Sequence, residues 1–71
     1  MRVFDFFEVE SRPVVVDRAD GVAWVWSGGR WRDAPGLVGK SYADGLPFDR
    51  EGFVAEFPFA DLAAIEMPTG Q

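Results

Sequence analysis

The sequence predicts a small α+β domain, in which an antiparallel β-meander of three to four strands is packed against one or two short C-terminal helices. Three observations carry this prediction. β-favouring segments separated by turn residues fill the first half, a Gly-Gly pair marks a tight hairpin, and helical patterns with a capping signal close the second half. A chain of 71 residues has room for one domain, residues 1–71, and 15% aromatic residues supply large core side chains.

The first predicted strand covers residues 2–9 and is apolar on both of its faces. Phe4 and Phe6 lie on one alternating set, whereas Phe7 and Val9 lie on the other. A strand of this kind is expected in the middle of a sheet, or with its second face covered by a helix or a second subunit. It is not expected to be a simple edge strand.

The second strand is predicted to run from Val14 toward a turn at residues 19–21, where glycine suits the left-handed position that closes a hairpin. If all three residues form the loop, Val14 and Val16 lie on the same face as the tryptophans that follow. If the loop contains only residues 20 and 21, Val15 lies on that face instead. Both registers stay open at this point.

The clearest local signal is Gly28-Gly29, a two-residue turn of the primed type between strands at residues 22–27 and 30–33. This turn fixes a register with three opposed pairs: Ser27 and Arg30, Trp26 and Trp31, Val25 and Arg32. Trp24, Trp26 and Trp31 therefore share one face of the hairpin. The other face is a mixed polar surface that could sit in water, formed by Ala23, Val25, Ser27, Arg30 and Arg32.

Residues 34–47 are rich in glycine and proline and are predicted to form a long connection, with at most a short turn or strand at residues 37–42. The sequence does not indicate whether this connection is ordered. Its segment Gly39-Lys40-Ser41 resembles the end of a phosphate-binding loop. That motif requires a first glycine at the position of Ala34, so no nucleotide site is predicted.

A helix is predicted to begin after Asp49, which has the side chain of a good N-cap. Phe48 before the cap and Phe53 within the helix are spaced for a hydrophobic staple. The helix must end near residue 57 because Pro58 follows. Its expected apolar stripe consists of Phe53, Val54 and Phe57.

Residues 59–67 fit a second short helix that buries Phe59, Leu62 and Ile65. The same segment also contains an alternation that fits a strand, and its alanines favour the helix. Residues 68–71 are expected to fray.

The chain contains no histidine and no cysteine, which removes the common general base, the thiol nucleophile and the usual soft metal ligands. We therefore predict no catalytic residue, no cofactor and no metal site, and expect a protein that is not an enzyme. Asp44, Asp49 and Glu51 are the candidate carboxylates for a hydrolase. A helix cap and ordinary solvation account for them more simply.

Twelve acidic and seven basic residues give a formal net charge of −5, which disfavours nucleic acid as a partner and favours a basic protein. No apolar run approaches the roughly 18 residues of a membrane helix. Together with the missing cysteines, this predicts a cytoplasmic protein without a membrane segment.

These observations favour a non-enzymatic protein-interaction module, such as a small accessory, inhibitory, antitoxin-like or immunity-like protein. Its partner would be another protein of basic character, or a second copy in a homodimer. The alternative is a direct ligand binder that uses the Trp/Arg hairpin for carbohydrate or single-stranded nucleic acid. Because the three tryptophans share the face that an amphipathic hairpin would bury, core packing is favoured over an exposed platform, and the sequence leaves the choice open. The candidate interaction surface is Trp24, Trp26, Arg30, Trp31, Arg32, Phe4 and Phe6.

Overall fold

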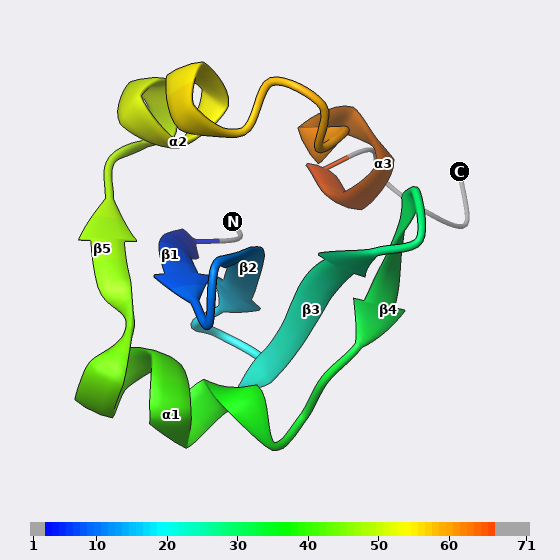
Figure 1. Ribbon diagram of the computed structural model, residues 1–71. Helices are drawn as coiled ribbons and strands as arrows, with labels where there is room; N and C mark the ends of the chain where they lie inside the picture. Colours follow the sequence, from blue (N-terminus) through cyan, green and yellow to red (C-terminus); the bar gives the residue numbers. More distant parts are fainter. Residues whose placement is uncertain (1–2, 67–71) are drawn as a thin grey trace.

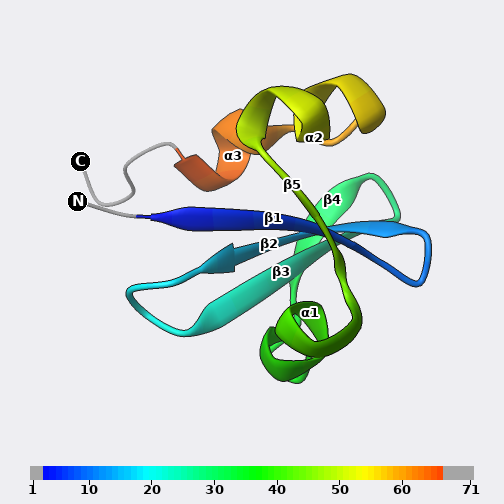
Figure 2. The same cartoon turned by 90° about the vertical axis from the view of Figure 1, so that its left-hand side faces the viewer.

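The computed structural model describes residues 3–66, which form a five-stranded antiparallel sheet with helices on both faces (Figures 1 and 2). The strands are β1 (Phe4–Val9), β2 (Arg12–Asp17), β3 (Val22–Ser27), β4 (Arg30–Asp33) and β5 (Leu46–Phe48), in the order β4-β3-β2-β1-β5. The helices are α1 (Leu37–Asp44), α2 (Arg50–Glu56) and α3 (Leu62–Glu66). The predicted α+β meander is confirmed, with one strand and one helix more than expected. The fraying expected at residues 68–71 lies outside the described part of the chain.

The doubly apolar β1 pairs with β2 on one side and with β5 on the other, so it is an interior strand as predicted. Helices α2 and α3 lie on one face of the sheet and α1 lies on the other, as Figure 2 shows. Phe6 faces α2, and Phe7 faces the layer that contains α1. Both apolar faces of β1 are therefore covered within one chain, without a second subunit.

A two-residue turn joins β1 to β2, and both of its residues have positive φ angles: 53° for Glu10 and 66° for Ser11. Strand β2 begins at Arg12, two residues earlier than expected. Pro13 is tolerated because the ladder between β2 and β3 starts only at Val14, so its missing N–H removes no bond from that ladder.

The hairpin between β2 and β3 has a four-residue loop, so neither of the two predicted loop lengths is correct. Asp17 pairs with Val22, and its Oδ1 accepts hydrogen bonds from the N–H groups of Ala19 (3.0 Å) and Asp20 (3.3 Å). This Asx-type turn adds one residue to the loop. Gly21 has the expected left-handed conformation, with φ of 68°.

The four-residue loop also decides which valine faces the tryptophans. Val15 pairs with Trp24, so Val15 lies on the tryptophan face, whereas the three-residue loop would have placed Val14 and Val16 there. Val14 and Val16 instead pack on the opposite face, in the layer beside α1.

The hairpin between β3 and β4 has the predicted turn and register. Gly28 and Gly29 have φ angles of 66° and 81°, as a primed turn requires. The opposed pairs are Ser27 with Arg30, Trp26 with Trp31, and Val25 with Arg32, and the ladder continues to Trp24 with Asp33.

The glycine-rich segment 34–47 contains helix α1 and most of β5, which corrects the prediction of a long connection. Leu37 and Val38 on α1 pack against the buried core residues on this face of the sheet, and this packing stabilises the helix. Gly45 ends α1, and its N–H donates to the carbonyl of Ser41 at 2.9 Å. The face of β3 that was expected to meet water is partly covered: Ala23 is buried, and Val25 contacts this layer.

The helix after Asp49 is confirmed, and the Asp49 carboxylate accepts a hydrogen bond from the Gly52 N–H at 2.7 Å. The rings of Phe48 and Phe53 meet edge to face at 6.2 Å, as expected for the staple. Helix α2 ends at residue 56, before Pro58. Its predicted stripe is only partly correct, because Val54 is exposed.

Helix α3 lies within the predicted range 59–67 and buries Leu62 and Ile65. Phe59 is exposed, contrary to the prediction, because the chain turns between α2 and α3 and leaves its ring outside the core.

The core has two layers, one on each face of the sheet. The buried residues on the α2/α3 side are Phe6, Val15, Phe53, Phe57, Ala60, Leu62 and Ile65. Those on the α1 side are Phe7, Val9, Val14, Val16 and Ala23.

None of the helices within residues 3–66 is long and apolar enough to cross a membrane.

Candidate interaction surface

The three tryptophans lie together on the β3–β4 hairpin, on the face that also carries α2 and α3. Trp26 and Trp31 are directly opposed, and their rings meet edge to face at a centroid distance of 5.1 Å. Trp24 lies two residues along β3, and its ring is 6.5 Å from that of Phe4. The Gly-Gly turn therefore sets this arrangement locally, through the register it imposes.

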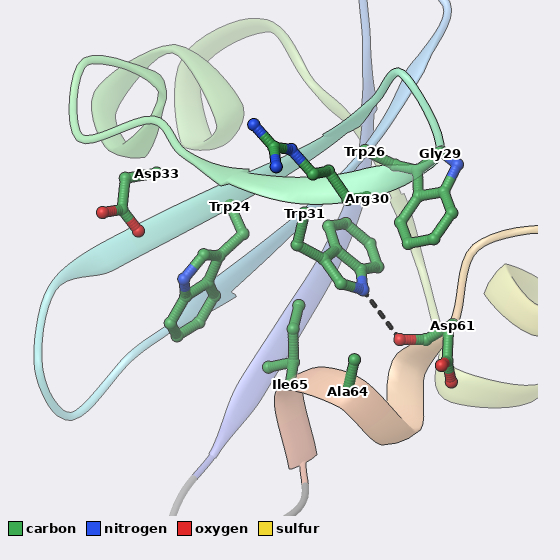
Figure 3. Close-up of a pocket in the computed structure, with 9 residues that line it drawn as sticks. All are labelled: Trp24, Trp26, Gly29, Arg30, Trp31, Asp33, Asp61, Ala64 and Ile65. Atoms are coloured by element: carbon green, nitrogen blue, oxygen red, sulfur yellow. Dashed lines mark hydrogen bonds between the residues drawn. The ribbon is translucent and has the colours of Figure 1, made fainter. Parts of the chain in front are cut away.

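All three tryptophans are half-buried. One side of the group packs against the core layer beneath α2 and α3, and the other side reaches solvent. Each tryptophan is thus in contact with the core and partly exposed to solvent. Trp31 is further fixed because its indole Nε1 donates to the carbonyl of Asp61 at 2.7 Å, which ties the hairpin to the start of α3 (Figure 3).

The tryptophans line an open pocket of about 520 Å³. Figure 3 shows Trp24 and Asp33 at one end of this pocket and Trp26 and Gly29 at the other. The full lining is Trp24, Trp26, Gly29, Arg30, Trp31, Asp33, Asp61, Ala64 and Ile65. We call this hollow the tryptophan pocket.

A second hollow of about 240 Å³ shares Trp24 and Asp33 with the tryptophan pocket and continues toward Val22 and Pro35. Asp33 is exposed, and its carboxylate has no hydrogen bond or ion pair with any of residues 3–66. A free carboxylate beside an indole is an arrangement that favours a cation.

The two arginines of the predicted surface point to the other face of the sheet, as the register requires. Arg32 donates from Nε to the Ser27 carbonyl at 3.2 Å, within its own hairpin. Arg30 lies at the rim of the tryptophan pocket. Neither arginine forms an ion pair inside the described range.

Of the two phenylalanines in the predicted surface, Phe6 is buried and packs at 5.1 Å from Phe53 of α2. It therefore offers no surface to a partner. Phe4 is half-buried at the side of Trp24 and borders the tryptophan face.

Sequence reasoning missed Asp33 and Asp61 as pocket residues. Extending the Gly-Gly register by one pair places Asp33 opposite Trp24. The position of Asp33 beside the tryptophans could therefore have been predicted from the sequence. Asp61 had no such signal, because its position depends on how the chain returns from α2 to the hairpin.

A separate polar cluster joins β1, the β2–β3 loop and α1 on the opposite face. Arg18 donates to both oxygens of Asp5, at 2.6 and 3.0 Å, and the Tyr42 hydroxyl donates to Asp5 as well. The Arg18 bond is the largest cause of the lowered pKa of Asp5. Burial, together with the bond to Asp5, raises the pKa of Tyr42. At neutral pH Asp5 is thus ionised and Tyr42 is protonated. In these states Asp5 accepts the hydrogen bonds that connect β1 to the β2–β3 loop and to α1.

The other segments considered for catalysis or nucleotide binding have structural roles in the fold. Gly39-Lys40-Ser41 lies inside α1, where Ser41 is fully buried and Lys40 Nζ approaches Asp44 at 3.7 Å and Glu10 at 3.9 Å. Asp49 caps α2. No group of three or more metal-ligating side chains occurs within residues 3–66.

A scan against protein-family models and searches of curated proteins and of solved structures found no match. The functional argument therefore rests on the geometry of the tryptophan pocket and on the charge around it.

Proposed function

We propose that this protein is a non-enzymatic interaction module that binds a basic protein partner through the tryptophan pocket. The observation that supports this proposal is the half-exposure of Trp24, Trp26 and Trp31 around one open pocket. Tryptophans that are anchored on one side and open on the other lose little conformational entropy when they bind, and they dominate binding hot spots.

Charge supports the choice of partner. The chain carries a formal net charge of −5, and Asp33 places at the pocket a carboxylate that has no partner among residues 3–66. A basic surface would be steered toward such a protein, while a nucleic-acid backbone would be repelled. An accessory, inhibitory, antitoxin-like or immunity-like role in the cytoplasm is part of the same proposal.

The test is affinity capture of the tagged protein from a lysate of its source organism, with mass spectrometry of the eluted complex. We expect a stoichiometric basic partner with the wild-type protein, and at least a tenfold loss of that partner with Trp24→Ala. Trp24 suits this test because it forms no hydrogen bond through its indole within the described residues and is half-exposed.

Phe59→Ala is the matched control, since it removes an exposed ring that is not part of the pocket lining. Circular dichroism and thermal melting must show both variants folded. Recovery of the protein alone, or equal capture by both variants, would contradict the proposal.

Direct binding of a carbohydrate is the second candidate, because the Trp24 ring and the Asp33 carboxylate provide a stacking face and a hydroxyl acceptor. Titration of tryptophan emission with oligosaccharides and with single-stranded oligonucleotides separates it from the first. A saturable emission change with sugar would favour this candidate, and unchanged emission would reject it.

A further inference from the structure

Strand β4 is the last strand in the sheet order, so one of its edges has no neighbouring strand among residues 3–66. The Ala34 N–H donates to the Ala23 carbonyl at 2.8 Å, which fixes the alternation of bonds along β4. In an antiparallel ladder the pairs alternate, so the N–H and C=O groups of Trp31 and Asp33 point away from β3. Within the described residues, the backbone N–H and C=O groups of these two residues are therefore available for hydrogen bonds to an added strand.

These same two residues direct their side chains to the tryptophan face. Trp31 and Asp33 oppose Trp26 and Trp24, and both line the tryptophan pocket. An added strand would place the side chains opposite Trp31 and Asp33 on this face as well, because opposed residues point to the same side. The open edge and the pocket thus form one continuous surface.

We propose that the basic partner binds as an extended segment that adds antiparallel to β4, with a lysine or arginine opposite Asp33. Its cationic end lies between the Asp33 carboxylate and the Trp24 indole, where charge attraction and a cation–π contact act together. This inference rests on the proposed function and specifies the binding mode.

A second copy of the chain is a poor occupant of this edge. Antiparallel self-pairing that uses the outward groups has three registers: Trp31 with Trp31, Trp31 with Asp33, or Asp33 with Asp33. The first register places Arg30 opposite Arg32, and the second places Arg32 opposite Arg32 of the other copy. The third places the two copies of Asp33 opposite each other. Directly opposed like charges destabilise a strand pair, so each register is penalised. A segment with a cation at the Asp33 position carries no such penalty.

The experiment uses the capped probe peptide acetyl-Ser-Thr-Lys-Thr-Val-Thr-Ser-amide, titrated to millimolar concentration into the ¹⁵N-labelled protein. In the antiparallel register its lysine opposes Asp33 and its valine opposes Trp31. We expect the largest amide shifts at Trp31 and Asp33, and slowed hydrogen exchange at both. Two control peptides carry glutamate in place of the lysine, or an N-methyl group on the valine, and both should bind at least fivefold more weakly.

Asp33→Asn should weaken binding of the lysine peptide by about two- to fivefold, the range of one partly exposed ion pair. Glu56→Gln is the matched control, because it makes the same charge change at an exposed position without a partner in the described range. It should leave the dissociation constant unchanged.

Absence of binding, shifts elsewhere on the surface, or equal binding of the N-methylated peptide would overturn strand addition. Sedimentation of a dimer with protected Trp31 and Asp33 amides would assign the edge to a second copy and overturn it too. Failure of the proposed function is distinct, because it shows as recovery of the protein alone in the capture experiment. If a partner is captured in a Trp24-dependent way but the β4 amides stay unprotected, the proposed function stands and binding by strand addition is rejected.

Discussion

At the residue scale, Asp5 is the group on which three separate segments converge. Its carboxylate accepts hydrogen bonds from Arg18 in the β2–β3 loop and from Tyr42 on α1. The side chain is 18% exposed, so solvent screens these bonds only in part. Asp5 therefore fixes both the loop and α1 against β1.

The lowered pKa of Asp5 predicts a pH dependence of stability. Because the folded state holds this pKa below its ordinary value of 3.8, the stabilisation is fully present above that pH and is lost as pH falls through the folded pKa. We expect Asp5→Asn to lower the free energy of unfolding by about 1 kcal/mol at pH 7. Urea unfolding at pH 7 and at pH 3 measures the effect.

The difference between Asp5→Asn and wild type should shrink at pH 3, because this pH is below 3.8 and the Asp5 carboxyl of the unfolded chain is then mostly protonated. Glu56→Gln should show no comparable difference at either pH. A destabilisation of equal size at both pH values would mean that the ionised carboxylate is not the cause.

The half-burial of Trp26 predicts a smaller stability loss than a core ring would give. Trp26 is half-buried, whereas Phe53 is fully buried among Phe6, Phe48 and Phe57. We expect Trp26→Ala to cost about 1–3 kcal/mol and Phe53→Ala about 3–5 kcal/mol, measured by urea unfolding. The second loss is large enough to unfold a domain of this size. Equal losses would show that the tryptophan face is as well packed as the core.

At the element scale, α1 is the helix that depends most on its surroundings. It buries Ser41 completely and packs Leu37 and Val38 against the sheet, but it contains Gly39 and has no side-chain N-cap bond. A weak local helix preference is thus compensated by tertiary packing and by a sharp end at Gly45.

Two glycine substitutions in this region should act in opposite directions. A Cβ on Gly45 would stand 2.5 Å from the Ser41 carbonyl oxygen and 3.1 Å from Phe7, whereas a Cβ on Gly39 meets nothing within 4 Å. We expect Gly45→Ala to destabilise by about 1–3 kcal/mol. Gly39→Ala should stabilise by up to about 1 kcal/mol through helix propensity. Thermal melting of both variants tests this, and a destabilising Gly39→Ala would contradict the assignment of α1.

At the scale of the whole molecule, the helices cover both faces of the central strands and leave the ends of the sheet different from each other. One edge is β5, a three-residue strand that contains Pro47 and is poorly suited to strand addition. The other edge is β4, with the tryptophan pocket beside it. Of the two edges, β4 is therefore the one that suits the proposed strand addition.

The sequence by itself determined the features that one or two residues impose on their neighbours. Gly28-Gly29 set the β3–β4 turn and its register, Asp49 capped α2, and Pro58 limited its end. These features depend on local backbone geometry and short hydrogen bonds, which a sequence encodes directly.

Only the tertiary structure decided the β2–β3 register, helix α1, strand β5 and the half-burial of the tryptophans. Asp17 lengthened the β2–β3 loop through side-chain bonds that compete with a tight turn, and α1 formed because the sheet offered it an apolar face. The pocket required α3 to come close to the hairpin, through the bond from Trp31 to Asp61. Helix α1, strand β5 and the pocket depend on contacts between residues distant in the chain, and the energies of these contacts exceed the local preferences that a sequence pattern displays. The β2–β3 loop depends on a local side-chain turn at Asp17, which competes with the tight turns that the glycine pattern favours.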